Sequence, residues 1–214
     1  MDHQGSLRER LIDVGVELVT TDGTAALGLR EIARRAGVSH GAPRRYFPTH
    51  HSLLSAIARR GFAELGARST AATAGLSSAR EQLQAIARTY VGYALEQRGM
   101  FELMFRHDLL DSGEQGEEQA SDQPRLRESS LPQFQFVVGL IARHRSEQRT
   151  AATDRPLPPP AVTAAALWTN LHGIAQLWTW GSIQLALETD GSATDSLDLL
   201  VSTALDAHLG PADR

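Results

Sequence analysis

Two adjacent arginines, Arg44 and Arg45, stand in a short run of small and polar residues with His40, Gly41 and Ala42. A guanidinium group can donate two hydrogen bonds at once, and its fork matches phosphate oxygens and the O6 and N7 atoms of guanine. Small neighbours allow a helix to approach a grooved surface closely, and the major groove of DNA, about 12 Å wide, admits one helix. The run therefore indicates a helix that reads double-stranded DNA.

Other chemistry has little support in the residue types. The chain contains no cysteine, which excludes disulfides, thiolate zinc sites and cysteine nucleophiles. His107 and Asp108 form the only notable acid–histidine pair, without obvious further metal ligands, and the sequence has neither a nucleophile elbow nor a glycine-rich phosphate loop. We expect no catalytic residue, no metal and no cofactor. An enzyme and a purely structural helical adaptor remain the alternatives to a DNA-binding protein.

The elements that must position the arginines form a predicted helix-turn-helix. A short helix is expected from Leu29 to Ala36, with the small Ala33 where a second helix crosses it. Gly37 tolerates the unusual backbone angles of the turn. The second helix is expected from His40 to Tyr46, with Ser39 as its N-cap.

The rest of the chain also has helical periodicity, and no strand or internal repeat is evident. Two capping boxes, at residues 6–9 and 78–81, mark helix starts. Gly99 is expected to interrupt a helix, and the acidic stretch 111–130 to form a mobile loop. Further helices are expected at residues 7–20, 52–66, 79–98, 100–105, 131–145, 161–187 and 196–209, with a proline-rich linker at 150–160.

Charge is distributed unevenly along the 214 residues, whose net charge is −4. Residues 1–60 hold nine arginines against six acids, whereas residues 61–214 hold twelve arginines against nineteen acids. A basic amino-terminal part beside an acidic remainder is a hint of nucleic-acid contact at the basic end. The polar start, Met1 to Arg10, has no apolar stretch typical of a secretory signal, so we expect a cytoplasmic protein.

One stretch requires a comparison with a membrane span. Residues 161–187 contain no charged residue and are long enough to cross a bilayer. However, Asn170, His172, Gln176 and Gln184 would be costly in hydrocarbon. A buried helix of a helical bundle explains the stretch better, and we expect no membrane association.

The helix-turn-helix string Leu29-Arg-Glu-Ile-Ala-Arg-Arg-Ala-Gly-Val-Ser-His-Gly-Ala-Pro-Arg-Arg-Tyr-Phe-Pro48 resembles the signature of the TetR family of repressors. The resemblance covers about residues 7–65. It departs from the family at Gly28, Arg44 and His50, where threonine, an aromatic residue and lysine are common. Arg44 could contact a base, a phosphate or only solvent. The resemblance implies these DNA-binding residues: Arg30, Ser39, His40, Gly41, Ala42, Arg44, Arg45, Tyr46 and His50.

A second string, Leu167-Trp168-Thr-Asn-Leu-His172-Gly173, resembles the Trp…His-Gly motif of one TetR carboxy-terminal subfamily, and residues 100–105 are similar to a short helix of those domains. The resemblance implies a domain that binds a small effector and forms a homodimer. Any of the aromatic residues could instead belong to the core, and we expect His172 to be hydrogen-bonded rather than a pH sensor. The candidate ligand-binding residues are Tyr90, Phe101, Met104, Phe105, Phe134, Trp168 and His172.

The last two helices are the expected dimer interface, because an apolar stripe on the final helix would otherwise face water. That stripe comprises Leu197, Leu200, Val201 and Ala204. We therefore expect an all-α fold of about nine helices, in which a three-helix DNA-binding domain precedes a helical bundle. The expected parts are a DNA-binding domain at 1–50, a connecting helix at 51–66, and a ligand-binding and dimerisation domain at 67–214. The expected function is a repressor released from a pseudo-palindromic operator by a small, largely apolar ligand.

Overall fold

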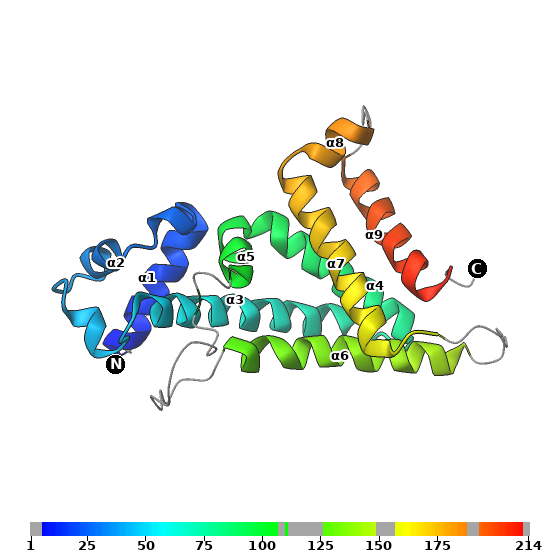
Figure 1. Ribbon diagram of the computed structural model, residues 1–214, viewed down its shortest axis with the longest axis horizontal. Helices are drawn as coiled ribbons and strands as arrows, with labels where there is room; N and C mark the ends of the chain where they lie inside the picture. The colour runs from blue at the N-terminus through cyan, green and yellow to red at the C-terminus, as the bar shows by residue number, and fades with distance from the viewer. Residues whose placement is uncertain (1–5, 107–109, 111–125, 149–156, 188–192, 212–214) are drawn as a thin grey trace. The chain divides into compact units, whose positions relative to one another are not determined.

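The computed structural model describes residues 6–106, 110, 126–148, 157–187 and 193–211 (Figure 1). In these ranges the chain forms nine α-helices and two short 3-10 helices, and no strand. The expectation of an all-α fold is confirmed. The chain divides into two compact units: unit 1 comprises Met1–Glu64 with Gln97–Ser130, and unit 2 comprises Leu65–Glu96 with Leu131–Arg214.

Unit 1 has a core built mainly from the first helix and the helices that follow it. The side-chain oxygen of Ser6 accepts a hydrogen bond from the Glu9 amide at 3.4 Å, so the N-cap expected there is confirmed. Leu11, Ile32 and Ile57 are all fully buried. The elements of unit 1 are α1 (Leu7–Thr21), η1 (Thr24–Ala26), α2 (Leu29–Arg35), η2 (Ala42–Arg45), α5 (Arg98–Phe105) and the first part of α3 (His50–Thr73).

Helix α5 corrects the expectation that Gly99 interrupts a helix. The break lies at Gln97, and Gly99 is inside α5. A Cβ atom on Gly99 would lie within 2.1 Å of the Val19 carbonyl oxygen. Glycine is therefore required at this position because α5 packs closely against α1, and not because a helix ends there.

Unit 2 is a bundle in which α4, α7 and α9 pack on one another. Its core includes Leu83, Ile141, Leu167 and Leu205. At the start of α4 the Ser78 amide donates to Glu81 Oε2 at 3.3 Å and the Glu81 amide to Ser78 Oγ at 3.4 Å, so the second capping box is confirmed. Its helices are α4 (Ala79–Glu96), α7 (Pro160–Thr179), α8 (Ser182–Leu187), α9 (Ala193–Leu209), most of α6 (Leu126–Glu147) and the end of α3.

Three helix boundaries differ most from the sequence expectation. The uncharged stretch 161–187 is two helices, because Gly181 adopts a φ of 77°, a left-handed conformation that ends α7. Helix α3 continues to Thr73, beyond the expected residue 66. Helix α6 begins at Leu126, so residues 126–130 are helical, while 111–125 lie outside the described residues.

No helix among the described residues has both the length and the hydrophobicity needed to cross a bilayer.

Candidate functional site

The turn after α2 has the geometry that a helix-turn-helix requires. Gly37 has a φ of 67°. Its amide donates to the Arg34 carbonyl at 3.1 Å, and the Val38 amide donates to the Ala33 carbonyl at 3.0 Å. This pair of bonds is a Schellman motif, which satisfies the last carbonyls of α2 and reverses the chain. The roles predicted for the glycine and for the buried Ala33 therefore fit the local structure.

The second helix of the motif differs from the expectation. An α-helix with Ser39 as N-cap was expected from His40 to Tyr46, but the structure has the short 3-10 helix η2. Pro43 has no amide to donate to the Ser39 carbonyl, so that carbonyl accepts from the Ala42 amide at 2.9 Å instead. Gly41 occupies the N-cap position without a side-chain cap.

Most of the predicted DNA-binding residues lie on an exposed part of unit 1. Pro43 is buried in the same segment and anchors it to the core. Exposed backbone and polar side chains can therefore face a partner from η2 and from the start of α2. The exposed residues are Arg30, Ser39, His40, Gly41, Arg44, Arg45 and Tyr46, while Ala42 and His50 are partly buried.

The last two arginines of α2 are engaged within the protein. Arg34 Nη2 lies 2.6 Å from Glu31 Oε1, and Arg35 Nε lies 2.9 Å from the same oxygen. Arg35 Nη2 also lies 2.6 Å from Asp22 Oδ2. Hydrogen bonds from Arg34 and then Arg35 lower the pKa of Glu31 to about 2, so its carboxylate stays charged and keeps both arginines paired.

Arg30, at the start of α2, and the two arginines of η2 differ from Arg34 and Arg35. Arg30, Arg44 and Arg45 form no ion pair with any residue in the described ranges. An arginine that has no internal acid has its donors available for phosphate or guanine. Only some arginines of the basic amino-terminal part therefore have a charge that no internal acid offsets. Counting charges in the sequence could not distinguish them from Arg34 and Arg35.

His50 occupies the first position of α3. Its Nε2 atom lies 2.5 Å from the Leu27 carbonyl oxygen, so this ring nitrogen donates to the backbone of unit 1. The bond fixes the ring at a helix N-terminus, a place where anions are favoured. A phosphate contact of His50 remains a prediction, and only the other ring nitrogen could make it.

In unit 2 the structure brings together three of the predicted ligand-binding residues, Tyr90, Trp168 and His172. Trp168 Nε1 donates a hydrogen bond to Tyr90 Oη at 2.9 Å, and Tyr90 Oη lies 2.8 Å from His172 Nδ1. The indole and imidazole rings meet edge to face, with centroids 6.1 Å apart. The hydrogen-bonded histidine expected from the sequence is thus present.

Burial determines the protonation of this cluster. Desolvation raises the pKa of Tyr90 well above its ordinary value, and the hydrogen bond from Trp168 offsets only part of the shift. Desolvation also lowers the pKa of His172, which favours the neutral ring. We assign the tyrosine hydroxyl as donor to Nδ1, since a tyrosine that keeps its proton needs an acceptor.

The other predicted ligand-binding residues belong to two different cores. Phe101 and Met104 are buried in unit 1, where Phe105 meets Phe101 with ring centroids 4.9 Å apart. Phe134 packs against the core of unit 2. A ligand-binding role for these four residues remains a prediction.

The stripe predicted as the dimer interface does not face water as a whole. Val201 is 1% exposed and Ala204 is 7% exposed, because they pack inside unit 2. Leu197 packs against the same core. The premise of the prediction was therefore wrong for Val201 and Ala204. The helical period alone cannot tell whether a stripe faces its own bundle or a partner.

The other helix expected at the interface, residues 161–187, exposes a larger apolar surface than the stripe on α9. On α7 and α8, large hydrophobic side chains remain exposed, above all Trp180 at 65% and Leu185 at 83%. Helix α7 buries only a narrow stripe that includes Leu167 and Leu171. We name the exposed set the α7–α8 surface: Val162, Trp168, Leu177, Trp180, Leu185 and Leu187.

Within the ranges that the structure describes, no group of three or more potential ligands could hold a metal ion. The pair His107–Asp108 lies outside the described residues.

Two family descriptions match the chain. "Bacterial regulatory proteins, tetR family" matches residues 11–57, and "Tetracyclin repressor-like, C-terminal domain" matches residues 83–203. An HTH-type transcriptional regulator in the dhlA 5′ region of Xanthobacter autotrophicus is 34% identical over 96 residues, which are 44% of this chain. The alignment spans 47% of that relative, so the chain covers about half its length.

Solved structures resemble the whole chain. A protein of unknown function from Rhodococcus sp. RHA1 is 30% identical, with a TM-score of 0.71 and coverage of 99% of this chain and 98% of that one. RolR, solved in complex with its ligand resorcinol, is 18% identical, with a TM-score of 0.63 and coverage of 96% and 88%. At that identity the likeness to RolR concerns the fold alone.

Proposed function

Because this chain belongs to the TetR family of bacterial regulatory proteins, we propose that it is a DNA-binding transcriptional regulator that acts as a repressor. The observation that carries the proposal is the exposed segment of η2, where Arg44 and Arg45 form no ion pair with described residues. A helix-turn-helix places its second helix in the major groove and its first across the backbone. Membership in a family of regulators supports this role over an enzyme.

The DNA test uses the full chain and a duplex from the region upstream of its own gene. Fluorescence anisotropy at moderate salt should show nanomolar to tens-of-nanomolar binding, the range typical of specific regulators. The double substitution Arg44→Ala with Arg45→Ala should abolish specific binding. The double substitution Arg88→Ala with Arg143→Ala, which removes the same two positive charges from unit 2, serves as the control and should bind normally. Equal binding by the double variant would refute the proposed reading segment.

We propose that the regulator is a homodimer that meets through the α7–α8 surface. Large exposed apolar patches on soluble proteins mark interaction sites, and a two-fold interface joins the same patch on both copies. Two reading segments related by such an axis would contact half-sites about 34–36 Å apart on a pseudo-palindromic operator. A cytoplasmic location follows from the same proposal, since the operator is there.

We further propose that a small, largely apolar effector binds unit 2 at the Tyr90–Trp168–His172 cluster and releases the repressor from DNA. The cluster combines aromatic surface with hydrogen-bonding atoms, the composition typical of small-molecule sites. RolR, which shares the fold, binds resorcinol, a small aromatic compound with two hydroxyl groups. Helix α3 carries residues of both units, so a change in its position could transmit the effect.

The release of the repressor from DNA by an effector can be tested because the two binding events must affect each other equally. If an effector weakens operator binding by some factor, the operator must weaken effector binding by the same factor. Effector affinity should be measured by calorimetry with and without a saturating operator duplex, using resorcinol and other small phenols as first probes. A phenol that binds equally tightly in both conditions would not be an inducer.

A further inference from the structure

Of the predicted DNA-binding residues, His50 of α3 is the one whose protonation the structure constrains. Its Nε2 atom lies 2.5 Å from the carbonyl oxygen of Leu27, in the turn between η1 and α2. A carbonyl oxygen carries no proton and can only accept, so Nε2 must carry the hydrogen of this bond. The bond therefore selects one of the two tautomers of the neutral ring.

The other ring nitrogen, Nδ1, has no proton in that tautomer. It forms no hydrogen bond with any residue in the described ranges. A phosphodiester oxygen of DNA is an acceptor only, and two acceptors cannot bond to each other. Neutral His50 therefore cannot donate a hydrogen bond from Nδ1 to a phosphate. Protonation of the ring makes Nδ1 a donor and adds a positive charge.

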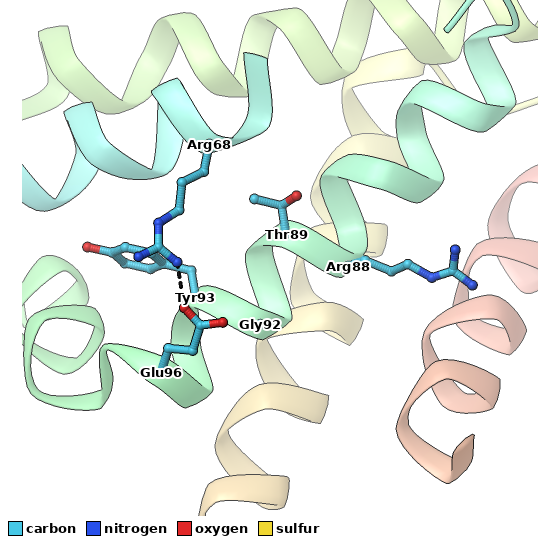
Figure 2. A pocket seen from close by; sticks show the side chains of 6 residues that line it. All are labelled: Arg68, Arg88, Thr89, Gly92, Tyr93 and Glu96. Carbon is cyan, nitrogen blue, oxygen red and sulfur yellow. Dashed lines mark hydrogen bonds and ion pairs between the residues drawn. The ribbon is translucent and has the colours of Figure 1, made fainter. Parts of the chain in front are cut away.

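No carboxylate pairs with His50 in the part of the chain that the structure describes. Elsewhere an internal acid pairs with a cation of the protein. Figure 2 shows Arg68 beside Glu96, with 2.6 Å between Nη1 and Oε2. A positive charge on His50 has no comparable partner among the described residues, so a DNA phosphate would supply the anion that the protein does not.

The other ionisable groups near the ring are of two kinds. Carboxylates and guanidinium groups keep their charge between pH 6 and pH 8. The pKa of Glu31 in particular is lowered to about 2, chiefly by hydrogen bonds from Arg34 and Arg35. On the elements that meet at the ring these groups are Asp22 before η1 and Arg30, Glu31, Arg34 and Arg35 of α2.

The second kind comprises histidines, which can change charge in this range. His51 follows His50 on α3 and is exposed, and His40 is exposed just before η2. The segment 47–49, which leads into α3, contains no ionisable side chain. A dependence of DNA binding on pH can therefore be assigned by separate substitution of these three histidines.

We propose that His50 binds a phosphate of the operator only as an imidazolium, so that each chain takes up a proton from the solvent when it binds DNA. This inference rests on the DNA-binding function proposed above and adds its dependence on pH. The bound protein then carries more protons than the free protein, so by linkage its affinity for DNA rises as the pH falls. The lysine that is common at this position stays charged and would give no such dependence.

The experiment measures binding of the full chain to the upstream duplex by fluorescence anisotropy at pH 6 and pH 8, at one ionic strength. Histidine ordinarily titrates near pH 6.5, within this range. The wild type should bind at least tenfold more tightly at pH 6. His50→Lys should bind at both pH values about as tightly as the wild type does at pH 6. His50→Gln should bind at both about as weakly as the wild type does at pH 8.

His51→Gln is the matched control, because it removes the neighbouring exposed histidine and should keep the wild-type ratio of the two affinities. Thermal unfolding at both pH values should show that the variants are folded. A dependence that is lost in His40→Gln and kept in His50→Gln would assign the proton to His40 and overturn the proposal.

The tautomer can be tested without DNA and without a substitution. Two-bond proton–nitrogen NMR spectra of the free protein at pH 8 should show His50 protonated at Nε2 and not at Nδ1, and the opposite tautomer would overturn the proposal. Equal wild-type affinity for the duplex at both pH values would also overturn it, while leaving the DNA-binding function intact. Absence of binding at both pH values would refute that function and this inference together.

Discussion

At the scale of single residues, the arginines of unit 1 differ in whether a neighbouring carboxylate pairs with them. Glu31 and Asp22 neutralise Arg34 and Arg35, and Glu9 pairs with Arg60 at 2.6 Å. An arginine held by a carboxylate must lose that contact before it can bind a phosphate. Positive potential for DNA therefore comes mainly from arginines without an internal acid, and Arg44 and Arg45 are adjacent examples on η2.

Arg44 and Arg45 are expected to differ in what they contact. Base contacts set specificity, whereas phosphate contacts set affinity for any sequence. Arg44→Ala should cost about 1–3 kcal/mol at one base pair of each half-site and relax the preference there. Arg45→Ala should weaken all duplexes alike and reduce the salt slope by about one unit. The measurement is affinity for a set of operator variants at two salt concentrations. An even loss across all variants for Arg44→Ala would make it a phosphate contact.

His172 gives unit 2 a dependence on pH. Its pKa is lowered in the folded chain by burial, so the unfolded chain binds more protons near and below the ordinary histidine pKa of about 6.5. Stability is therefore full above that pKa and is lost as the pH falls through it. Denaturant unfolding at pH 8 and pH 5.5, at one protein concentration, should show a smaller pH-dependent loss for His172→Gln than for the wild type. The exposed His51→Gln should keep the wild-type loss, and identical behaviour of all three proteins would contradict the assignment.

At the scale of elements, local signals predicted local structure well. The N-cap at Ser6, the capping box at Ser78 and the turn at Gly37 involve neighbours in sequence, so residue type was enough to place them. The Glu9 carboxylate, expected to complete a box at Ser6, instead pairs with Arg8 and Arg60. The form of η2 depended on one missing amide at Pro43, which the periodicity did not reveal. The end of α3 at Thr73 is marked by Gly75, whose φ of 79° ends the helix, a signal that the sequence prediction did not use.

The candidate site was predictable to a similar degree. The motif strings located the exposed segment 39–46 and the contacting pair Trp168–His172, although the α-helix expected from His40 to Tyr46 is the 3-10 helix η2. Binding of DNA or of a ligand by these residues stays a prediction. Distances between helices were beyond the sequence, including the bond between Tyr90 and His172. Ion pairing of Arg35 with Asp22 and the exposure of α8 likewise depend on packing between segments distant in sequence.

Gly99 supports a prediction at the element scale. A Cβ there would lie 2.1 Å from the Val19 carbonyl oxygen, a backbone atom that cannot move without shifting α1. Gly99→Ala should therefore lower the free energy of unfolding by about 1–3 kcal/mol, the cost of overpacking. Gly139→Ala, whose Cβ would meet nothing within 4 Å, should instead raise it by about 0.5–1 kcal/mol. Urea denaturation measures both, and a stabilised Gly99→Ala would show that the close approach is absent.

At the scale of the whole molecule, the exposed apolar area of α7 and α8 is the feature on which the proposed dimer rests. Leu185 is 83% exposed and Trp180 is 65% exposed, and α7 carries no charged residue between Pro160 and Thr179. Charged residues are usually depleted from the centre of an interface and abundant on free surface. A second copy of the chain can cover such a surface, because in a two-fold interface the same patch of each copy buries that of the other.

The prediction of a dimer interface rests on the exposed side chains of the α7–α8 surface rather than on the apolar stripe of α9. Leu177→Asp combined with Leu185→Asp places charges at two exposed positions, so each chain should stay folded while the interface is lost. Size-exclusion chromatography with light scattering should report a monomer, and circular dichroism should report unchanged helicity. Val201→Asp should behave differently, because that side chain is 1% exposed and its substitution buries an unpaired charge, which unfolds unit 2.

The monomer also has a consequence for DNA. A dimer contacts two half-sites with one loss of rotational and translational freedom, whereas separate monomers lose it twice. The double-aspartate variant should therefore bind a complete operator at least tenfold more weakly, with an affinity close to its affinity for a duplex that carries one half-site. A variant that stays dimeric and keeps full operator affinity would place the interface on another exposed face, such as that of Leu199, which is 69% exposed on α9.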